Sequence, residues 1–218
     1  MEKSRNKNFE KELPIGYKQA LYINAKDARL GIILNVIAIA VMVLIMGIAF
    51  VALSIGGVSL SDHFGASPFA LIVPYLILFA ATAAYIVLHE LVHGAAYKAM
   101  TGERLTFGIS WSCAFCGVPN VYTYKRCALI SVIAPFAIFS LLLIPTLIIL
   151  YYVNPIYYLA TAFILGLHLG GCSGDLYVTY LLLVRFKGKK TLMRDTGPEQ
   201  FFYVYTPENK QIQESCNG

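Results

Sequence analysis

Two histidines and a glutamate form the pattern with the clearest chemical meaning in this sequence. His89, Glu90 and His93 give the spacing His-Glu-x-x-His. On a helix, residues four positions apart lie on one face, so both imidazoles can bind one Zn²⁺ ion in adjacent tetrahedral positions. In such motifs the glutamate does not bind the metal but takes a proton from the water that the metal activates. The pattern therefore predicts a zinc site with Glu90 as the catalytic base.

The motif lies in the segment Tyr85–Tyr97, "YIVLHELVHGAAY", which otherwise has the composition of a membrane helix. Ionisable groups in hydrocarbon are costly and are tolerated mainly when they are paired, metal-bound or facing water. A histidine that merely packs in the core is the alternative, and it explains one residue but not three at this spacing. We therefore interpret the segment as a metal site within a membrane helix.

A catalytic zinc site has a third protein ligand, and the sequence offers two candidates, His168 and Asp175. His89 follows Pro68 by 21 residues and Asp175 follows Pro155 by 20 residues, counted from the outer starts of their helices. At about 1.5 Å per residue, both lie about 30 Å from the outer surface. His168 lies roughly 10 Å further out. The depth of these residues in the membrane therefore favours Asp175 as the third ligand. His168 is then a residue that supports the site, a gate for the substrate or a packed histidine.

A stripe of glycines precedes Asp175 in the same apolar segment. Gly166, Gly170 and Gly174 recur every four residues, a spacing that lets two helices approach closely. In an ideal helix Asp175 would point away from this stripe. Either the stripe packs against a helix other than the one with the zinc motif, or the helix unwinds near Gly171 to Gly174.

The composition is that of a membrane protein. Of the 218 residues, 58% are hydrophobic and 13% are charged, whereas soluble domains have about a quarter charged residues. Four apolar segments are each long enough to span a bilayer as a helix: Leu30–Ile55, Pro68–Met100, Ala128–Val153 and Pro155–Val184. These segments predict an all-α membrane protein, a bundle of four transmembrane helices.

The basic residues predict how the chain crosses the membrane. All 17 Lys and Arg residues fall within residues 1–29, 98–126 and 185–210. Because Lys and Arg concentrate in cytosolic segments, both termini and the middle loop are expected in the cytosol of a multi-pass cell-membrane protein. The net charge of +5 is explained by this pattern, so nucleic acid is not an expected partner. The sequence makes no prediction of the oligomeric state.

The division into domains follows from the same pattern. We expect a cytosolic N-terminal tail over residues 1–29, a four-helix metalloprotease domain over 30–185 and a cytosolic C-terminal tail over 186–218. No removable signal peptide is expected, since the first 29 residues are polar.

The loop between the second and third helices predicts a short cytosolic β-hairpin. The β-rich stretches "LTFGISWS" and "VPNVYTY" flank the turn-prone "CAFCG". Cys113 and Cys116 form a lone CxxC, which we interpret as a turn that happens to hold two cysteines, because no second pair accompanies it. A substrate could add to the edge of this hairpin as a strand.

The zinc motif and the glycine-rich segment with Asp175 together resemble the site-2 protease type of intramembrane metalloprotease. They are more similar still to a bacterial group of small four-helix membrane proteins described as putative zincin peptidases. "HELVHG" and "GGCSGDLY" carry the resemblance, which covers roughly residues 80–185. By the resemblance, His89, His93 and Asp175 match the zinc ligands and Glu90 matches the catalytic glutamate. Site-2 proteases usually have Asp followed by Gly, often after Asn-Pro, whereas here the order is Gly174-Asp175-Leu176.

The sequence thus predicts a zinc-dependent metalloendopeptidase that acts on a membrane protein or peptide within or beside the lipid bilayer. The alternative is a non-catalytic membrane protein that uses the same cluster to bind metal, or an inactive scaffold. Glu90 separates the two, because a protein that only binds metal does not need a carboxylate beside the first histidine.

Overall fold

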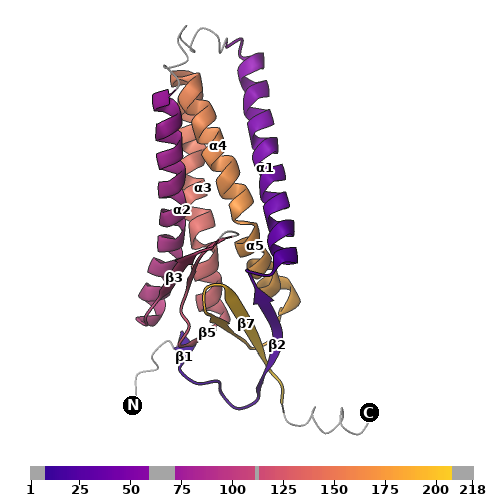
Figure 1. Ribbon diagram of the computed structural model, residues 1–218. Coiled ribbons are helices and arrows are strands. Elements are labelled where there is room, and N and C mark those ends of the chain that lie inside the picture. Colours follow the sequence, from indigo (N-terminus) through magenta and orange to yellow (C-terminus); the bar gives the residue numbers. More distant parts are fainter. Residues whose placement is uncertain (1–7, 59–71, 111–112, 208–218) are drawn as a thin grey trace. The chain divides into compact units, whose positions relative to one another are not determined.

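The computed structural model describes residues 8–58, 72–110 and 113–207, and Figure 1 labels most of its helices and strands. In chain order these are β1 (Phe9–Glu10), β2 (Tyr17–Asn24), α1 (Ala28–Ile55), α2 (Ile72–Thr101), β3 (Thr106–Ile109), β4 (Ala114–Gly117), β5 (Tyr122–Tyr124), α3 (Lys125–Val153), α4 (Pro155–Gly171), α5 (Ser173–Tyr180), the π-helix η2 (Leu181–Arg185), β6 (Thr191–Asp195) and β7 (Glu199–Tyr205).

Four helical stretches of the described chain are long and apolar enough to cross a membrane. They are α1, α2, α3 and the stretch Pro155–Arg185 that comprises α4, α5 and η2. The four helices predicted from composition are therefore confirmed in number and length within this part of the chain. The predicted start of the second helix at Pro68 lies outside the described residues.

The chain divides into two compact units. The sheet unit comprises Met1–Gly31, Glu90–Ala134 and Asp175–Gly218, and the helical unit comprises Ile32–His89 and Pro135–Gly174. All 17 Lys and Arg residues of the sequence belong to the sheet unit. The described residues of the helical unit carry no Asp, Glu, Lys or Arg, which suits segments surrounded by lipid.

The glycine stripe of α4 packs against α1, both within the helical unit. A Cβ atom at Gly166 would lie 3.0 Å from the Cα atom of Met42, and one at Gly170 would lie 2.5 Å from the backbone oxygen of Ala38. The small residues therefore allow the two backbones to approach. The first alternative left by the sequence is therefore correct: the stripe packs against α1 and not against the helix with the zinc motif.

The helix that carries Asp175 is also interrupted, so the second alternative holds as well. α4 ends at Gly171 and is capped by Cys172, whose N–H donates to the carbonyl oxygen of His168 over 3.0 Å. α5 then starts at Ser173, and Asp175 stands in its first turn. The direction of the Asp175 side chain is consequently set by α5 rather than by the periodicity of α4.

Changing Gly170 to Ala is expected to destabilise the protein by about 1–3 kcal/mol, because the added methyl group would meet the backbone of α1. Gly171→Ala is the matched control, since a Cβ atom there has no neighbour within 4 Å. The measurement is thermal unfolding of both variants in detergent. Equal midpoints for the two variants would contradict the assigned contact.

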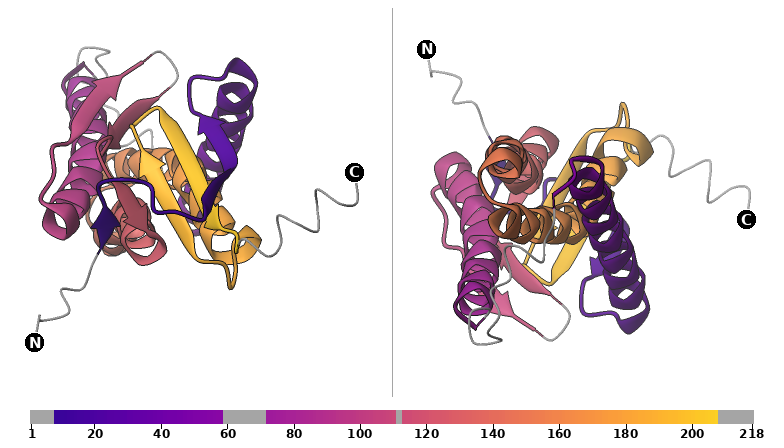
Figure 2. Two further views of the ribbon diagram at one scale, coloured as in Figure 1. Left: turned by 90° about the horizontal axis from the view of Figure 1, so that it is seen from below. Right: turned by 90° about the horizontal axis from the view of Figure 1, so that it is seen from above.

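A five-stranded antiparallel sheet corrects the prediction of an all-α protein. Its strand order is β1-β5-β6-β7-β2, so both terminal segments and the middle loop contribute to it. Figure 2 shows β6 and β7 side by side, with β2 next to β7. The sheet packs on one hydrophobic core with the ends of α2, α3 and η2, including Tyr97, Ala128 and Leu182. The stretch "DTGPEQFFYVY" contains the end of β6, the turn after it and all of β7.

The predicted hairpin between α2 and α3 is present, but its strands differ from those expected. β3 pairs with β4, from Thr106 opposite Gly117 to Ile109 opposite Ala114. The stretch "CAFCG" is therefore largely strand and not a turn. Residues 111–112, which join the two strands, lie outside the described residues, and a separate turn at residues 119–120 follows β4. "VPNVYTY" supplies β5, which joins the larger sheet.

Candidate metal centre

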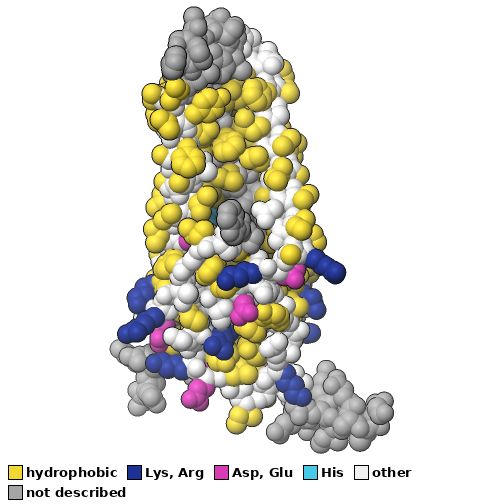
Figure 3. All heavy atoms as spheres, in the orientation of Figure 1, with side chains coloured by type: hydrophobic (Ala, Val, Ile, Leu, Met, Phe, Trp, Pro, Cys, Tyr) yellow, Lys and Arg dark blue, Asp and Glu magenta, His cyan; other side chains and the backbone are white. Residues whose placement is uncertain are grey.

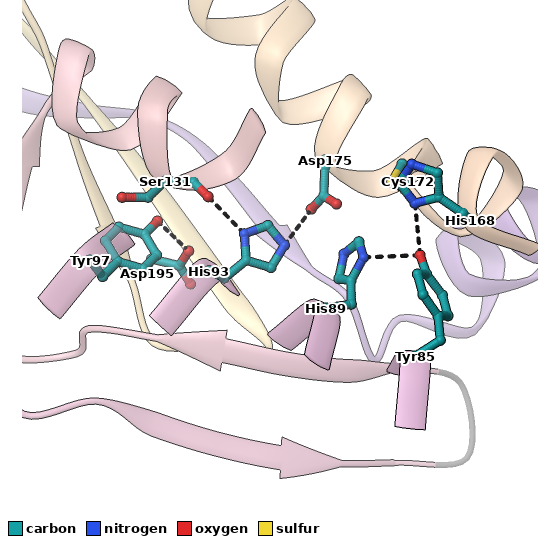
Figure 4. Close-up of polar contacts among 9 residues, drawn as sticks. All are labelled: Tyr85, His89, His93, Tyr97, Ser131, His168, Cys172, Asp175 and Asp195. Carbon is teal, nitrogen blue, oxygen red and sulfur yellow. Dashed lines mark hydrogen bonds and ion pairs between the residues drawn. The ribbon is translucent and has the colours of Figure 1, made fainter. Parts of the chain in front are cut away.

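A row of four side chains runs along one face of α2. Tyr85, His89, His93 and Tyr97 follow one another at intervals of four residues, so each lies about one turn after the last. Between 1% and 9% of each residue is exposed. Figure 4 shows the four side chains projecting from the helix toward the same side. The predicted pair of histidines thus stands in the middle of a longer row of polar groups.

His93 has a polar neighbour at each ring nitrogen. Its Nδ1 lies 2.8 Å from the carbonyl oxygen of Ser131 in α3, and its Nε2 lies 3.4 Å from Oδ1 of Asp175 in α5. A carbonyl oxygen can only accept, so Nδ1 carries a proton and donates it. Nε2 is therefore the atom that His93 presents to a metal ion beside Asp175.

The three predicted ligands fit a zinc ion. His89 stands one turn before His93 on the unbroken helix α2, so both imidazoles lie on one face of it, and Asp175 lies beside His93. In a tetrahedral zinc site, ligand atoms about 2.0–2.1 Å from the ion lie about 3.4 Å apart. The separation between His93 and Asp175 is 3.4 Å. Two imidazoles and one carboxylate also leave a fourth position for water.

His168 belongs to a second group of candidate ligands. Ligand atoms of His168, Cys172 and His89 lie within 4.8 Å of one another. The hydroxyl of Tyr85 lies 2.9 Å from Nδ1 of His168 and 3.1 Å from Nδ1 of His89. The two residues considered as third ligands are therefore placed differently, since Asp175 contacts His93 and His168 contacts Tyr85.

Glu90 is half-buried and belongs to neither group of candidate ligands in the described chain. Burial and then the charges of Asp195 and Glu90 raise the pKa of the Cys116 thiol to about 12. Cys116 is on β4, so the carboxylate of Glu90 lies near enough to the hairpin to act on it electrostatically.

A buried contact ties the turn between β6 and β7 to α2, one helical turn after His93. The Tyr97 hydroxyl donates to Oδ2 of Asp195 over 2.9 Å, and the N–H of Gly197 donates to Oδ1 over 2.9 Å. Burial raises the pKa of Asp195 to about 6, although the hydrogen bonds from Gly197 and Tyr97 oppose that rise. The contact helps to hold this part of α2 against the sheet.

Several of these polar groups were missed by reasoning from the sequence. Tyr85 and Tyr97 stand four residues before and after the two histidines, and Cys172 stands four residues after His168, so helical spacing could have found them. Ser131 acts through its backbone carbonyl oxygen. No property of its side chain signals that role.

A comparison with protein families matches residues 82–190 to the family described as "Putative zincin peptidase", which is half of the 218-residue chain. The chain belongs to the putative zincin peptidase family. The matched residues include His89, Glu90, His93 and Asp175, and the family description indicates a zinc metallopeptidase. The resemblance to this family that the sequence motifs predicted is thereby confirmed.

Neither the comparison with curated proteins nor the comparison with solved structures found a match for this zincin-family chain.

Proposed function

We propose that this protein is a membrane-embedded zinc metalloendopeptidase of the His-Glu-x-x-His type, which cleaves membrane-embedded or juxtamembrane peptide segments. One observation carries the proposal. A ring nitrogen of His93 and a carboxylate oxygen of Asp175 lie 3.4 Å apart beside a helix that is apolar enough to cross a membrane and that also carries His89 one turn earlier. Membership of the putative zincin peptidase family supports the same conclusion.

In this proposal His89, His93 and Asp175 hold the zinc ion. When bound, the ion supplies Lewis acidity to the scissile carbonyl and makes a water molecule nucleophilic near neutral pH. Glu90 accepts a proton from that water as the water oxygen adds to the carbonyl carbon. The same carboxyl group then gives the proton to the amide nitrogen as the C–N bond breaks.

We further propose that the sheet unit lies on the cytosolic side. Figure 3 shows Lys, Arg, Asp and Glu side chains over the strand-bearing part of the chain and hydrophobic side chains over the helices. Because Lys and Arg are retained in cytosolic segments, this distribution supports cytosolic termini and a cytosolic middle loop. The metal site would then lie near the cytosolic ends of its helices, where water can reach it.

The hairpin β3–β4 is the proposed place for the substrate backbone. It packs on α2 next to the metal motif, since a Cβ atom at Gly94 would lie 2.6 Å from the ring of Phe107. Among the described residues, β3 pairs with β4 alone, so its outer edge faces no other strand. An unwound peptide could pair with that edge, which would expose its amide bonds beside Glu90.

The register shows which groups of β3 face outward. Ser110 N–H donates to the carbonyl oxygen of Cys113 over 2.8 Å, so these two residues form a hydrogen-bonded pair. Hydrogen-bonded and non-hydrogen-bonded pairs alternate along an antiparallel ladder. The N–H groups of Ile109 and Phe107 therefore point to the outer edge, whereas the N–H group of Thr106 points to β4.

Ile109→Pro is expected to lower kcat/KM about two- to tenfold, because it removes one outward donor and keeps the bonds within the hairpin. Ile109→Ala is the matched control: it removes the 77% exposed side chain and retains the N–H group. The measurement is cleavage of a single-span test peptide in liposomes. Equal rates for the two variants would contradict substrate pairing at this edge.

Removal of metal is expected to stop cleavage reversibly. The purified full-length chain would be reconstituted with a panel of single-span test peptides, and products would be identified by mass spectrometry before and after treatment with a zinc chelator. Cleavage should fall to background with the chelator and return when Zn²⁺ is restored. Cleavage that persists after zinc is shown to be absent would overturn the proposal. A chain that binds zinc but cleaves no peptide would support a non-catalytic metal-binding protein instead.

A further inference from the structure

The hydroxyl of Tyr85 lies between two histidines, and the geometry of this contact bears on how His89 can bind metal. The hydroxyl oxygen is 3.1 Å from Nδ1 of His89 and 2.9 Å from Nδ1 of His168. His168 continues the chain of contacts, because its Nε2 lies 3.0 Å from Oγ of Ser140. Figure 4 shows Tyr85 with its hydroxyl directed to both rings.

Hydrogen bonds along this chain of contacts can be donated in either direction. The direction decides whether Nε2 of His89 is free of a proton and can bind metal. Tyr85 has a single hydroxyl proton, so it can donate to one imidazole and accept from the other. If His89 Nδ1 donates, the Tyr85 hydroxyl donates to His168 Nδ1, and Nε2 of His89 keeps its lone pair for a metal ion. If the direction is reversed, Nε2 of His89 carries the proton and cannot bind metal.

The surroundings of His168 favour the first direction. Cys172 Sγ lies 3.6 Å from Nδ1 of His168, and a thiol is a weak donor, so it favours Nδ1 as an acceptor. Nε2 of His168 then carries the proton and donates to Ser140. In this direction every contact in the chain has one donor and one acceptor.

Packing fixes the ring of His168 in place. The residue is fully buried, and its ring centroid lies 6.0 Å from that of Phe136 and 5.9 Å from that of Phe139. Phe139 also contacts the ring of Tyr85 edge-on, with centroids 5.2 Å apart. The relay from Ser140 to His89 is therefore surrounded by packed aromatic rings of the helical unit.

We propose that Tyr85 and His168 are positioning residues that hold His89 in the tautomer that presents Nε2 to zinc. The proposal rests on the zinc site proposed above and assigns a role to His168, which is not needed as a ligand. Loss of a group that hydrogen-bonds a ligating imidazole typically weakens metal binding about 10- to 100-fold. We expect a loss of that size when Tyr85 or His168 is changed.

A second metal ion held by His89, His168 and Cys172 is the competing explanation of the same cluster. We favour the relay because the Tyr85 hydroxyl is already within hydrogen-bonding distance of both Nδ1 atoms. A metal ion bound through those nitrogens would have to replace both contacts. The stoichiometry of metal binding separates the two explanations.

The test uses the full-length chain in detergent with Co²⁺ as the probe, because cobalt in a tetrahedral site has an absorption spectrum that reports its ligands. Tyr85→Phe is expected to weaken Co²⁺ and Zn²⁺ binding about 10- to 100-fold and to alter the cobalt spectrum. Tyr75→Phe is the matched control, since Tyr75 is on the same helix and 64% exposed. Thermal unfolding would be measured for both variants.

His168 provides a second pair of variants, which keeps the test decisive if Tyr85→Phe does not fold. His168→Leu removes the acceptor for the Tyr85 hydroxyl and should weaken metal binding as Tyr85→Phe does. His168→Asn supplies a side-chain oxygen near the position of Nδ1, so it should restore most of the affinity. A merely structural role for His168 would not produce this rescue.

Three outcomes would overturn the inference. A wild-type chain that binds one ion, with Tyr85→Phe unchanged in affinity and spectrum, would exclude the relay and leave the zinc site intact. A second cobalt ion that is lost in Cys172→Ser would assign the cluster to metal. A wild-type chain that binds no ion would overturn the zinc site together with the relay.

Discussion

Replacing Glu90 by glutamine is expected to lower kcat by a factor of about 10² to 10⁴ while the protein keeps its zinc. Glutamine has nearly the same shape as glutamate, but it cannot take a proton from water or return one to the leaving nitrogen. Zinc should remain because Glu90 belongs to neither group of candidate ligands in the described chain. The two measurements are zinc content by elemental analysis and cleavage of a single-span test peptide in liposomes.

The matched control for Glu90→Gln is Glu12→Gln, the same chemical change at an exposed position before β2. It should leave zinc content and cleavage at wild-type levels. Unchanged cleavage in Glu90→Gln would rule out the proposed role of this residue as the base. Loss of zinc together with loss of cleavage would show that Glu90 helps to hold the ion, which the proposal does not allow.

The helices of this protein could be predicted from sequence, because their signal is local. Each apolar run is bounded by charged or turn-forming residues, and its length alone decides whether it can cross a bilayer. The five-stranded sheet could not be predicted in the same way. Phe9 pairs with Thr123, and Tyr17 pairs with Tyr205, so each short strand finds its partner far along the chain. Nothing in a two- or eight-residue strand specifies such a partner.

The hairpin shows a different limit of prediction from sequence. Two cysteines and a glycine suggested a turn at "CAFCG", but Cys116 is 7% exposed and packs as a small hydrophobic residue in β4. Which face of that strand is buried depends on elements contributed from elsewhere in the chain, since Val118 N–H just beyond β4 donates to the carbonyl oxygen of Asp195 over 2.8 Å.

The candidate site was easier to predict than the sheet, because helical spacing within one segment determines which side chains lie on the same face. His89 and His93 share a face of α2 by their spacing alone, and depth in the membrane indicated Asp175. The groups that orient these residues depend on other helices. Ser131 contributes a carbonyl oxygen from α3, and Ser140 lies beside His168, contacts that spacing within one helix cannot reveal.

Asp175→Asn is expected to weaken zinc binding by about 100-fold or more. Loss of a residue that only orients a ligand typically costs about 10- to 100-fold, and loss of a ligand should cost at least the upper part of that range. The carboxylate of Asp175 is the sole negative charge in the proposed ligand set, and a neutral amide oxygen is a weaker ligand for a divalent cation. The measurement is zinc affinity by competition with a chromogenic chelator, with cleavage followed in parallel.

Two matched variants show whether the effect of Asp175→Asn belongs to this residue. Asp27→Asn should leave zinc binding unchanged, since Asp27 accepts from the N–H of Leu30 at the start of α1 and asparagine caps helices equally well. His168→Asn should also keep nearly full zinc occupancy, because it retains an acceptor for Tyr85. Wild-type affinity in Asp175→Asn combined with lost affinity in His168→Asn would instead make His168 the third ligand. The depth argument and the 3.4 Å contact between His93 and Asp175 both predict the opposite result.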